Sequence, residues 1–309
     1  MFPAGDEGVI QTNDDATACK RSAVRLGYWK DPFIEHFVGS HRSSSFSSSS
    51  SLSASSPAAA AAASSLLMSH PKSIGNRFDR KAPEINRGYY ARVQAFAYLL
   101  DQYFEMLQLY NSNPHHSASS PTTTGHSAEA RPLKCQIINI GCGYDTLFWR
   151  LKSSGKTDLV ASFVDLDLPS VTCKKLHHIR APQSPLLPVL GEDIRCNQFE
   201  LHSSEYHLVA CDLRNVPELH KKLFDECHLD ASLPTLVISE CVLVYMSRSD
   251  THGFLRWSSG AFSNCLIVNY EQVNVFDKFG EVMVENLRQR GCEIMDIDAC
   301  RDLNTQSSR

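Results

Sequence analysis

A glycine turn after a short apolar run is the feature that most constrains the fold of this chain. Residues 135–140 (Cys-Gln-Ile-Ile-Asn-Ile) have the length and the β-branched content of a buried strand. The run ends at Gly141-Cys142-Gly143, and helical character resumes at Leu147. Glycine lets a backbone turn sharply and lie against a ligand without a Cβ in the way. Strand, glycine turn and helix in this order predict the first half of a nucleotide-binding βαβ unit.

The residues after the turn indicate which kind of nucleotide could bind. A dinucleotide fingerprint has a third glycine three residues after the second, so that a pyrophosphate can approach the helix N-terminus. This chain has Thr146 at that position, preceded by Asp145. An acidic turn repels phosphate and favours a cationic ligand without a pyrophosphate, such as S-adenosylmethionine. The alternative interpretation is an ordinary strand-to-helix turn with no ligand.

Four further apolar runs predict strands, and helices are expected between them. The runs cover residues 159–164, 207–211, 235–239 and 266–270. A strand-then-helix order that recurs in this way predicts an α/β fold with a doubly wound parallel sheet. The ligand of such a sheet is expected across the carboxyl ends of its strands.

Acidic residues follow four of the predicted strands, and three of them are candidate site residues. Asp167 could accept two hydrogen bonds from ribose hydroxyls, and it is also an acceptable N-cap for the next helix. Asp212 could accept the exocyclic amine of adenine with Leu213 against the ring, or could form a surface turn with Arg214. Glu240 has apolar neighbours on both sides, and carboxylates are rarely buried without a partner. We therefore expect Glu240 to face a ligand or a cation.

Arg92 lies beside the apolar face of an amphipathic helix, where its guanidinium could either snorkel to solvent or take a carboxylate.

Low-complexity stretches divide the chain into unequal parts. The start of the chain is polar and is expected to be loose. The expected organisation is a helical cap (1–38), a disordered Ser/Ala-rich insertion (39–80), the lid helix (81–110), a disordered linker (111–132) and a Rossmann-like core (133–309).

Composition narrows the class of protein and its compartment. Hydrophobic residues make up 42% of the chain and charged residues 21%, which is ordinary for a globular protein. A net charge of −4 gives no electrostatic case for binding nucleic acid or an anionic membrane. The 11 cysteines include no Cys-x-x-Cys, so they are expected to be buried thiols in a reducing compartment. We expect a cytoplasmic, monomeric protein with no metal site and no membrane-spanning segment.

Longer motifs resemble the leucine carboxyl methyltransferase family. The segments that carry the resemblance are Ala18–Arg21, Gly27–Trp29 with Asp31-Pro32, Lys81–Tyr89, Asp145-Thr146 with Phe148–Leu151, Ala210–Arg214, Ser239–Met246 and Asn269–Asn274. They cover most of the chain outside the low-complexity stretches, and they are far more specific than the glycine turn.

The resemblance implies a class I S-adenosylmethionine-dependent methyltransferase fold with N-terminal helical additions. The family methylates the C-terminal leucine carboxylate of the catalytic subunit of type 2A protein phosphatase. Contacts to S-adenosylmethionine are implied for Lys20, Arg92, Gly141, Asp167, Asp212, Leu213 and Glu240. Arg92, with Tyr245 near it, would also face the substrate carboxylate. Relatives continue beyond the position of Arg309, so we expect this chain to be shortened at its C-terminus and to lack the last strands of the sheet.

Three other functions stay open on the sequence. An NAD-dependent oxidoreductase shares the strand, glycine turn and ribose-binding acid, although Asp145-Thr146 in place of the third glycine argues against it. A shortened chain could instead bind the cofactor or the phosphatase tail without turnover. A small-molecule O-methyltransferase would use the same glycine turn.

Overall fold

A computed structural model describes residues 6–37, 80–113, 132–191 and 193–309. The two stretches expected to be disordered, 39–80 and 111–132, lie almost entirely outside these residues. Among the residues described, seven strands form one sheet in the order β3-β4-β5-β2-β1-β6-β7. The strands are β1 (Cys135–Ile140), β2 (Val160–Asp167), β3 (Arg195–Cys196), β4 (Leu201–His202), β5 (Tyr206–Ala210), β6 (Thr235–Glu240) and β7 (Cys265–Tyr270).

The five longer strands are parallel, and β1 lies between β2 and β6. Ile138 on β1 is in register with Val164 on β2 and with Val237 on β6. Strands β2 and β5 follow β1 on one side, whereas β6 and β7 lie on the other, so the winding direction switches beside β1. The predicted doubly wound sheet is therefore confirmed. The antiparallel strands β3 and β4 were not expected, because each has only two residues and carries no periodic signal.

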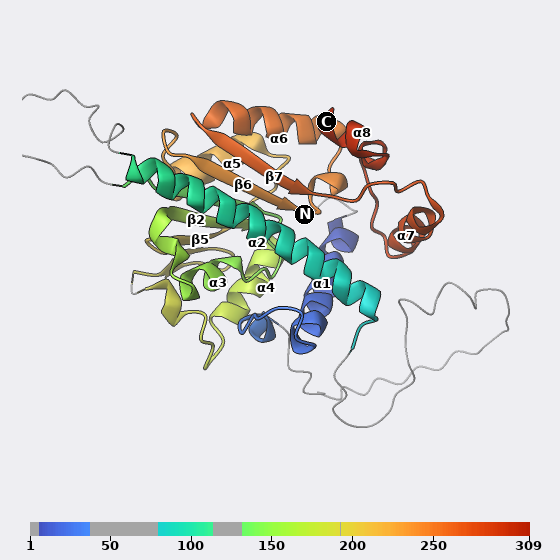
Figure 1. Cartoon of the computed structure of the whole chain (residues 1–309), viewed down its shortest axis with the longest axis horizontal. Coiled ribbons are helices and arrows are strands. Elements are labelled where there is room, and N and C mark those ends of the chain that lie inside the picture. Colours follow the sequence, from blue (N-terminus) through green and yellow to red (C-terminus); the bar gives the residue numbers. More distant parts are fainter. Residues whose placement is uncertain (1–5, 38–79, 114–131, 192) are drawn as a thin grey trace, which may run out of the picture.

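Helices cover both faces of the sheet, as Figure 1 shows for α2 across one face and α5 and α6 across the other. Side chains alternate along β1, so Ile137 packs under α2 and α3 while Ile138 packs under α5 and α6. The α-helices are α1 (Asp6–Arg25), α2 (Pro83–Ser112), α3 (Leu147–Ser153), α4 (Pro169–Ile179), α5 (Val216–Lys221), α6 (Arg248–Ala261), α7 (Lys278–Gln289) and α8 (Leu303–Ser307). Shorter turns are 3-10 helices η1 (Ile34–Phe37), η3 (Lys156–Leu159), η4 (Pro188–Leu190), η6 (Leu243–Tyr245) and η7 (Ile297–Cys300), and a π-helix, η5 (Lys222–Glu226).

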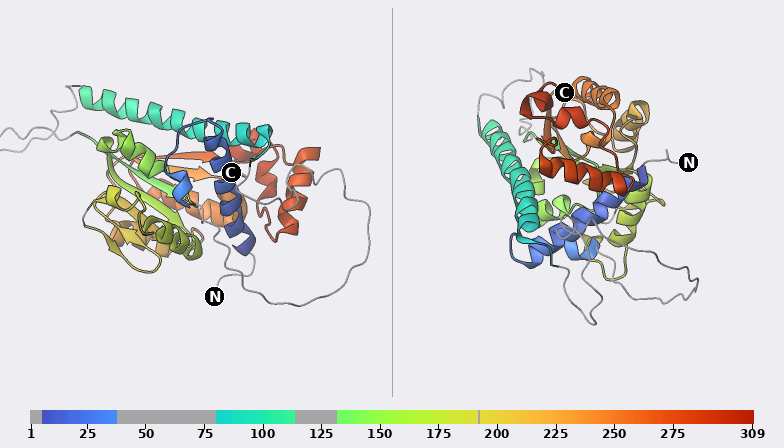
Figure 2. Two further views of the ribbon diagram at one scale, coloured as in Figure 1. Left: turned by 90° about the horizontal axis from the view of Figure 1, so that it is seen from below. Right: turned by 90° about the vertical axis from the view of Figure 1, so that its right-hand side faces the viewer.

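The N-terminal segment forms one long helix from Asp6 onward, within the range expected to be a helical cap. Figure 2 shows α1 crossing the carboxyl-end edge of the sheet between α2 and α7. Asp6 and Glu7 stand in its first turn, where the helix dipole favours negative charge. A Cβ on Gly8 would lie 2.4 Å from the carbonyl oxygen of Gly291, so this glycine permits the close approach of α1 to the end of α7. Tertiary contacts, rather than an apolar stripe, hold this polar helix.

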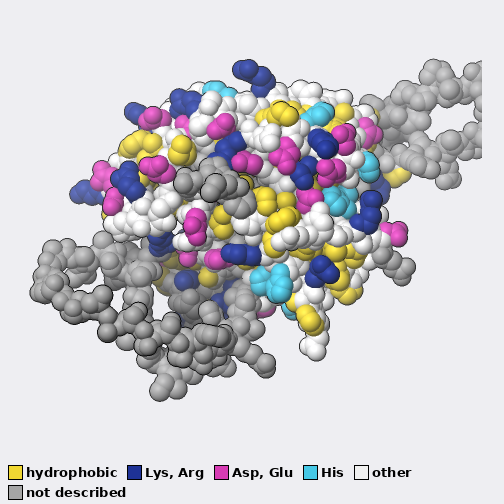
Figure 3. Space-filling model, turned by 180° about the vertical axis from the view of Figure 1, so that it is seen from behind, with side chains coloured by type: hydrophobic (Ala, Val, Ile, Leu, Met, Phe, Trp, Pro, Cys, Tyr) yellow, Lys and Arg dark blue, Asp and Glu magenta, His cyan; other side chains and the backbone are white. Residues whose placement is uncertain are grey.

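Surface and thiol chemistry agree with the composition. Figure 3 shows acidic and basic side chains interspersed over the described part of the back face. All 11 cysteines lie within the described residues and are in the reduced form. Six of them are buried, but Cys196 is exposed, so the expectation of buried thiols holds only in part. None of the helices in the described ranges is both long enough and apolar enough to cross a bilayer. At the sheet edge, β7 pairs with β6 alone among the described strands, and Leu266 on it is 46% exposed.

Candidate active site

A cavity of about 1870 Å³ opens at the carboxyl ends of β1, β2, β5 and β6. Its walls also include α1, the first turns of α2 and the inner side of α7. Open α/β sheets bind ligands at this edge, at the point where the winding direction switches. The volume exceeds the roughly 300–1,000 Å³ of ordinary ligand pockets, which leaves room for a nucleoside and for the end of a peptide together.

Every residue predicted for the site lines this cavity. They come from separate elements and are brought together only by the fold: Lys20, Arg92, Gly141, Asp167, Asp212, Leu213, Glu240 and Tyr245. The cofactor and substrate roles given to them remain predictions, because the structure contains neither molecule.

The glycine turn is held in a conformation that other residues would adopt with strain. Gly141 has φ +54° and Gly143 has φ +49°. A Cβ on Gly141 would lie 2.5 Å from Val242 Cγ2, and one on Gly143 would lie 2.3 Å from Asn13 Oδ1. The Tyr144 N–H donates to Asn13 Oδ1 at 2.9 Å, so α1 is docked on the turn. Glycine is needed here for both the turn and the close approach of neighbouring chain segments.

Asp167 ends β2 and points its carboxylate at the glycine turn. Its Oδ2 accepts the Gly143 N–H and its Oδ1 accepts the Leu168 N–H, each at 2.7 Å. The alternative role as N-cap of α4 is wrong, because Leu168 is the N-cap and Pro169 occupies the first turn. Burial raises the pKa of Asp167 to about 6, and the two N–H donors partly oppose that rise. The carboxylate is therefore mostly ionised at pH 7.

Glu240 faces two cations, which confirms the expectation that it has a charged partner. Its Oε1 lies 2.9 Å from Lys20 Nζ, and Arg92 Nε donates to the same oxygen. The snorkelling interpretation of Arg92 is wrong, since its guanidinium points to Glu240. The same guanidinium lies 5.3 Å from the ring centre of Tyr89 and 5.9 Å from that of Tyr270. Lys20, Arg92 and Glu240 thus form one ionic cluster with a net charge of about +1.

Asp212 and Leu213 follow β5 on the far side of the cavity. Asp212 accepts the Arg214 N–H at 2.9 Å and also pairs with the Arg214 guanidinium. Arg214 in turn reaches Asp6 on α1 at 2.8 Å. The turn with Arg214 is therefore present, and Asp212 also lines the cavity beside the buried Leu213. Its contact with adenine stays a prediction.

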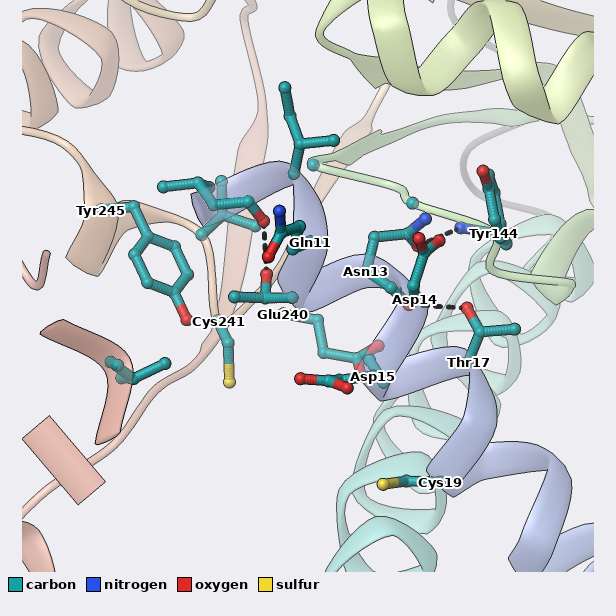
Figure 4. A pocket seen from close by; sticks show the side chains of 18 of the residues that line it. Gln11, Asn13, Asp14, Asp15, Thr17, Cys19, Tyr144, Glu240, Cys241 and Tyr245 are labelled. Carbon is teal, nitrogen blue, oxygen red and sulfur yellow. Dashed lines mark hydrogen bonds between the residues drawn. The ribbon is translucent and has the colours of Figure 1, made fainter. Parts of the chain in front are cut away.

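Tyr245 belongs to a loop that a buried carboxylate holds in place. Glu271 Oε1 accepts the N–H groups of Val242 and Val244, each at 3.2 Å. Burial raises the pKa of Glu271 to about 7 and raises the pKa of the Tyr245 hydroxyl, so Tyr245 is a neutral donor. Figure 4 shows Tyr245 and Tyr144 at opposite sides of the cavity, with α1 passing between them.

A buried polar network supports the site from below. Lys175 Nζ donates to Asp165 Oδ2 at 2.7 Å and to the Asp145 carbonyl at 3.0 Å. Tyr206 and Asn139 donate to the same Asp165 carboxylate at 2.8 Å each. Burial would lower the pKa of Lys175, but Asp165 more than offsets this effect and keeps the ammonium charged. The side chains of Lys175 and Asp165 are 0% and 1% exposed, so neither has water as an alternative partner.

Sequence reasoning missed Asn13 and the buried role of Asp145. Asn13 lies in a polar stretch of the expected helical cap, and no local pattern marks it as a partner of the glycine turn. Asp145 Oδ1 accepts the Thr146 N–H at 2.6 Å and the Leu147 N–H at 3.1 Å, just before the start of α3. Burial would raise the pKa of Asp145, but Lys20, Arg150 and Lys175 lower it to about 2. A cation-rich neighbourhood of this kind is visible only once distant segments are placed together.

Comparisons with known proteins agree with this geometry. The leucine carboxyl methyltransferase family matches residues 126–259. Leucine carboxyl methyltransferase 1 of Rattus norvegicus is 33% identical over 308 residues, which cover 98% of this chain and 74% of that protein. The protein of the same name from Caenorhabditis elegans is 34% identical over 310 residues, at 98% and 75% coverage. Human tRNA wybutosine-synthesizing protein 4 is 28% identical over 309 residues, which cover 98% of this chain and 36% of that protein.

The sheet order and the position of the cavity define the class of the protein. It has the class I fold of methyltransferases that use S-adenosylmethionine, with helices added at its N-terminus. Within that class, the chain belongs to the leucine carboxyl methyltransferase family. The fold and the family expected from the sequence are thereby confirmed.

Proposed function

We propose that this chain transfers a methyl group from S-adenosylmethionine to the α-carboxylate of a C-terminal leucine. The proposed acceptor is the tail of the catalytic subunit of type 2A protein phosphatase. One observation carries the proposal: a cationic pair, Lys20 and Arg92, shares a cavity with the strand-end carboxylates Asp167 and Asp212. The names of the rat and nematode relatives supply the leucine carboxylate as acceptor.

The wider setting of the reaction is part of the same proposal. The reduced thiols suit a reducing compartment, so we place the reaction in the cytoplasm and take the protein to act as a monomer. Residues 1–38 and 81–110 would serve as cap and lid over the core, because α1 and the start of α2 supply cavity walls.

The residues present fit S-adenosylmethionine. Asp167 would offer an ionised carboxylate to a ribose diol, and the glycine turn whose Gly143 N–H it accepts would lie beside the nucleoside. Asp212 with the buried Leu213 offers an acceptor and an apolar surface to adenine. Lys20, which pairs with Glu240, would hold the methionyl carboxylate. When bound, the cofactor supplies a methyl group on a positively charged sulfur.

The chain itself has to position the acceptor rather than deprotonate it. An α-carboxyl has a pKa of about 3.3–3.7, so it is already an anionic nucleophile at neutral pH and needs no general base. Arg92 would hold this carboxylate, and the neutral hydroxyl of Tyr245 would donate a second hydrogen bond. Because Glu240 compensates the charge of Arg92, the guanidinium can orient the carboxylate without strongly reducing its nucleophilicity. Holding the two reactants in line can lower the activation barrier by about 7–11 kcal/mol.

Water exclusion is the second contribution expected from the cavity. Met283 and Leu287 on α7 and Met246 after η6 give it apolar walls. Opposite charges neutralise as methyl transfer proceeds, so a poorly hydrated pocket favours the transition state over bulk water. Once water is excluded, the carboxylates at the strand ends would be the main polar groups that hold the methyl donor.

A methyl-transfer assay with two matched peptides tests the proposal. The acceptor is a peptide with the phosphatase C-terminal sequence ending in leucine, and its control is the same peptide with a C-terminal amide. We expect labelled methyl groups from S-adenosylmethionine to reach the free acid and not the amide. Equal labelling of both peptides would reject the carboxylate as acceptor. Labelling of neither, with a small phenol or acid labelled instead, would favour a small-molecule O-methyltransferase.

A further inference from the structure

A second cluster of chemically active side chains lies away from the cavity. It consists of His202 on β4, His207 on β5 and Cys227 at the end of the π-helix η5. A ring nitrogen of each histidine and the Cys227 sulfur lie within 4.8 Å of one another. His207 stands near the N-terminal end of β5, whereas the cavity opens at the carboxyl end of the same strand. The cluster is therefore independent of the methyl-transfer site.

The sheet aims the two histidines at the same point. His202 and His207 are directly opposite partners in the antiparallel β4–β5 pair. Their strand neighbours Leu201, Tyr206 and Leu208 belong to the core under α2. Because side chains alternate along a strand, both histidines point to the other face, where Cys227 belongs to the core under α5 and α6.

The backbone near Cys227 has two unusual features. Cys227 directly follows the π-helix Lys222–Glu226, and such turns are rare and are found frequently at functional sites. His228 after it has φ +55°, in the left-handed region that residues other than glycine seldom adopt. The chain thus departs from regular helix geometry at the place where the thiol meets the histidines.

The distances are close to those of a bound zinc ion. His202 Nδ1 and His207 Nδ1 are 3.0 Å apart. Two nitrogens at about 2.0–2.1 Å from one tetrahedral zinc would lie about 3.3 Å apart. His207 and Cys227 are 6% and 4% exposed, so two of the three ligands are already withdrawn from water. Small side-chain movements suffice to bring all three to one ion.

We propose that His202, His207 and Cys227 form a binding site for a zinc ion, with a water molecule completing the tetrahedron. Two imidazoles and one thiolate are donors that zinc prefers, and a zinc site with three protein ligands keeps its fourth position for water. Glu226 lies within 4.8 Å of His202 together with Glu200. It is not counted among the ligands, because it belongs to a different group of side chains from His207 and Cys227.

Binding exchanges one proton for one metal ion. Burial lowers the pKa of both histidines, so both rings are neutral at pH 7 and can coordinate without losing a proton. Burial raises the pKa of the Cys227 thiol to about 12, so the free protein keeps its proton. On binding, the S–H bond breaks, a zinc–sulfur bond forms, and the proton leaves to water. The ion would tie the β4–β5 hairpin to the end of η5 and stabilise the folded chain by mass action.

Cobalt(II) is the probe that tests this site, because its absorption reports the ligands. Tag-free full-length protein, treated with a chelator, is titrated with cobalt(II) chloride and then with zinc chloride. We expect one cobalt per chain, a thiolate-to-cobalt charge-transfer band with tetrahedral d–d bands, and displacement of cobalt by zinc. Cys227→Ser should abolish the charge-transfer band. Loss of a residue that contacts only a metal ligand weakens binding by about 10–100-fold. His202→Gln removes a ligand itself, at a half-exposed position, and should therefore weaken cobalt binding by more than that.

Matched controls separate this site from other metal-binding side chains. Cys265→Ser removes a half-buried thiol elsewhere, and His252→Gln removes an exposed histidine; both should bind cobalt as the wild type does. A double variant at His115 and His116, which lie outside the described residues, should also leave the bands unchanged. The proposal is overturned if wild-type protein gives no charge-transfer band. It is equally overturned if a folded Cys227→Ser or His202→Gln protein keeps wild-type binding.

Discussion

Cofactor binding should weaken in mild acid because Asp167 becomes protonated. Burial raises the pKa of this carboxyl to about 6 in the free protein, and the proposed role needs its ionised form to accept the ribose hydroxyls. At pH 7 about nine-tenths of the molecules carry the charge, and at pH 5 about one-tenth do. The affinity for S-adenosylmethionine should therefore fall about tenfold between these pH values, which is about 1.4 kcal/mol.

Asp167→Asn isolates this effect. The amide keeps a carbonyl acceptor but loses the charge, and hydrogen bonds to charged groups are worth about 1.5–3 kcal/mol. We expect the variant to bind roughly 10–100-fold more weakly at pH 7 and to show no change between pH 7 and pH 5. Calorimetric titration at constant ionic strength measures both proteins, with circular dichroism to confirm folding at pH 5. A wild-type affinity that does not change over this range, or an Asp167→Asn protein that keeps the pH dependence, would refute the reasoning.

Three further predictions follow from the contacts around the site. Arg92→Ala should lose most methyl transfer to a leucine-ended peptide while circular dichroism stays that of the wild type; unchanged turnover would reject its role. Glu271 has its pKa raised by burial from an ordinary 4.5 to about 7, so the folded state holds a proton that the unfolded chain releases. Stability should therefore fall as pH rises from about 4.5 through 7, by roughly 3 kcal/mol, and Glu271→Gln should flatten that slope in urea unfolding at pH 5 and 8. Parallel slopes for the two proteins would contradict this. Lys175→Met should cost roughly 3–5 kcal/mol in the same assay, because it leaves the Asp165 carboxylate buried without its cation. Asp165→Asn should cost a similar amount, because it leaves the Lys175 ammonium buried without its anion. The double variant should cost less than the sum of the two single losses, and additive losses would show that the ion pair is not the cause.

The main features of the fold were accessible from the sequence because they depend on local patterns. Residues 135–140 are apolar throughout and are followed by a glycine turn, and both faces of β1 are indeed buried. Glu240 stood out because a carboxylate among apolar neighbours must have a partner. The sequence could show that a partner was needed, but not that Lys20 and Arg92, 220 and 148 residues away, would both supply it.

Features fixed by long-range contacts could not be read from local patterns. Helix α1 is polar along much of its length, and only its contacts with the glycine turn and with Gly291 make it a wall of the cavity. The N-cap role considered for Asp167 failed because β2 continues three residues beyond the apolar run 159–164, through Asp167 itself. The cluster of His202, His207 and Cys227 has no zinc spacing in the sequence, since a two-residue strand and a π-helix bring its members together.

The most direct test of the account is a calorimetric titration of the full-length chain with S-adenosylmethionine and, separately, with NAD. Its central claim is that carboxylates at adjacent strand ends receive a cationic nucleoside. We predict that one S-adenosylmethionine binds per chain, that Glu240→Ala weakens this binding, and that NAD gives no heat. Binding of NAD in the absence of S-adenosylmethionine binding would contradict the claim and assign the cavity to a dinucleotide.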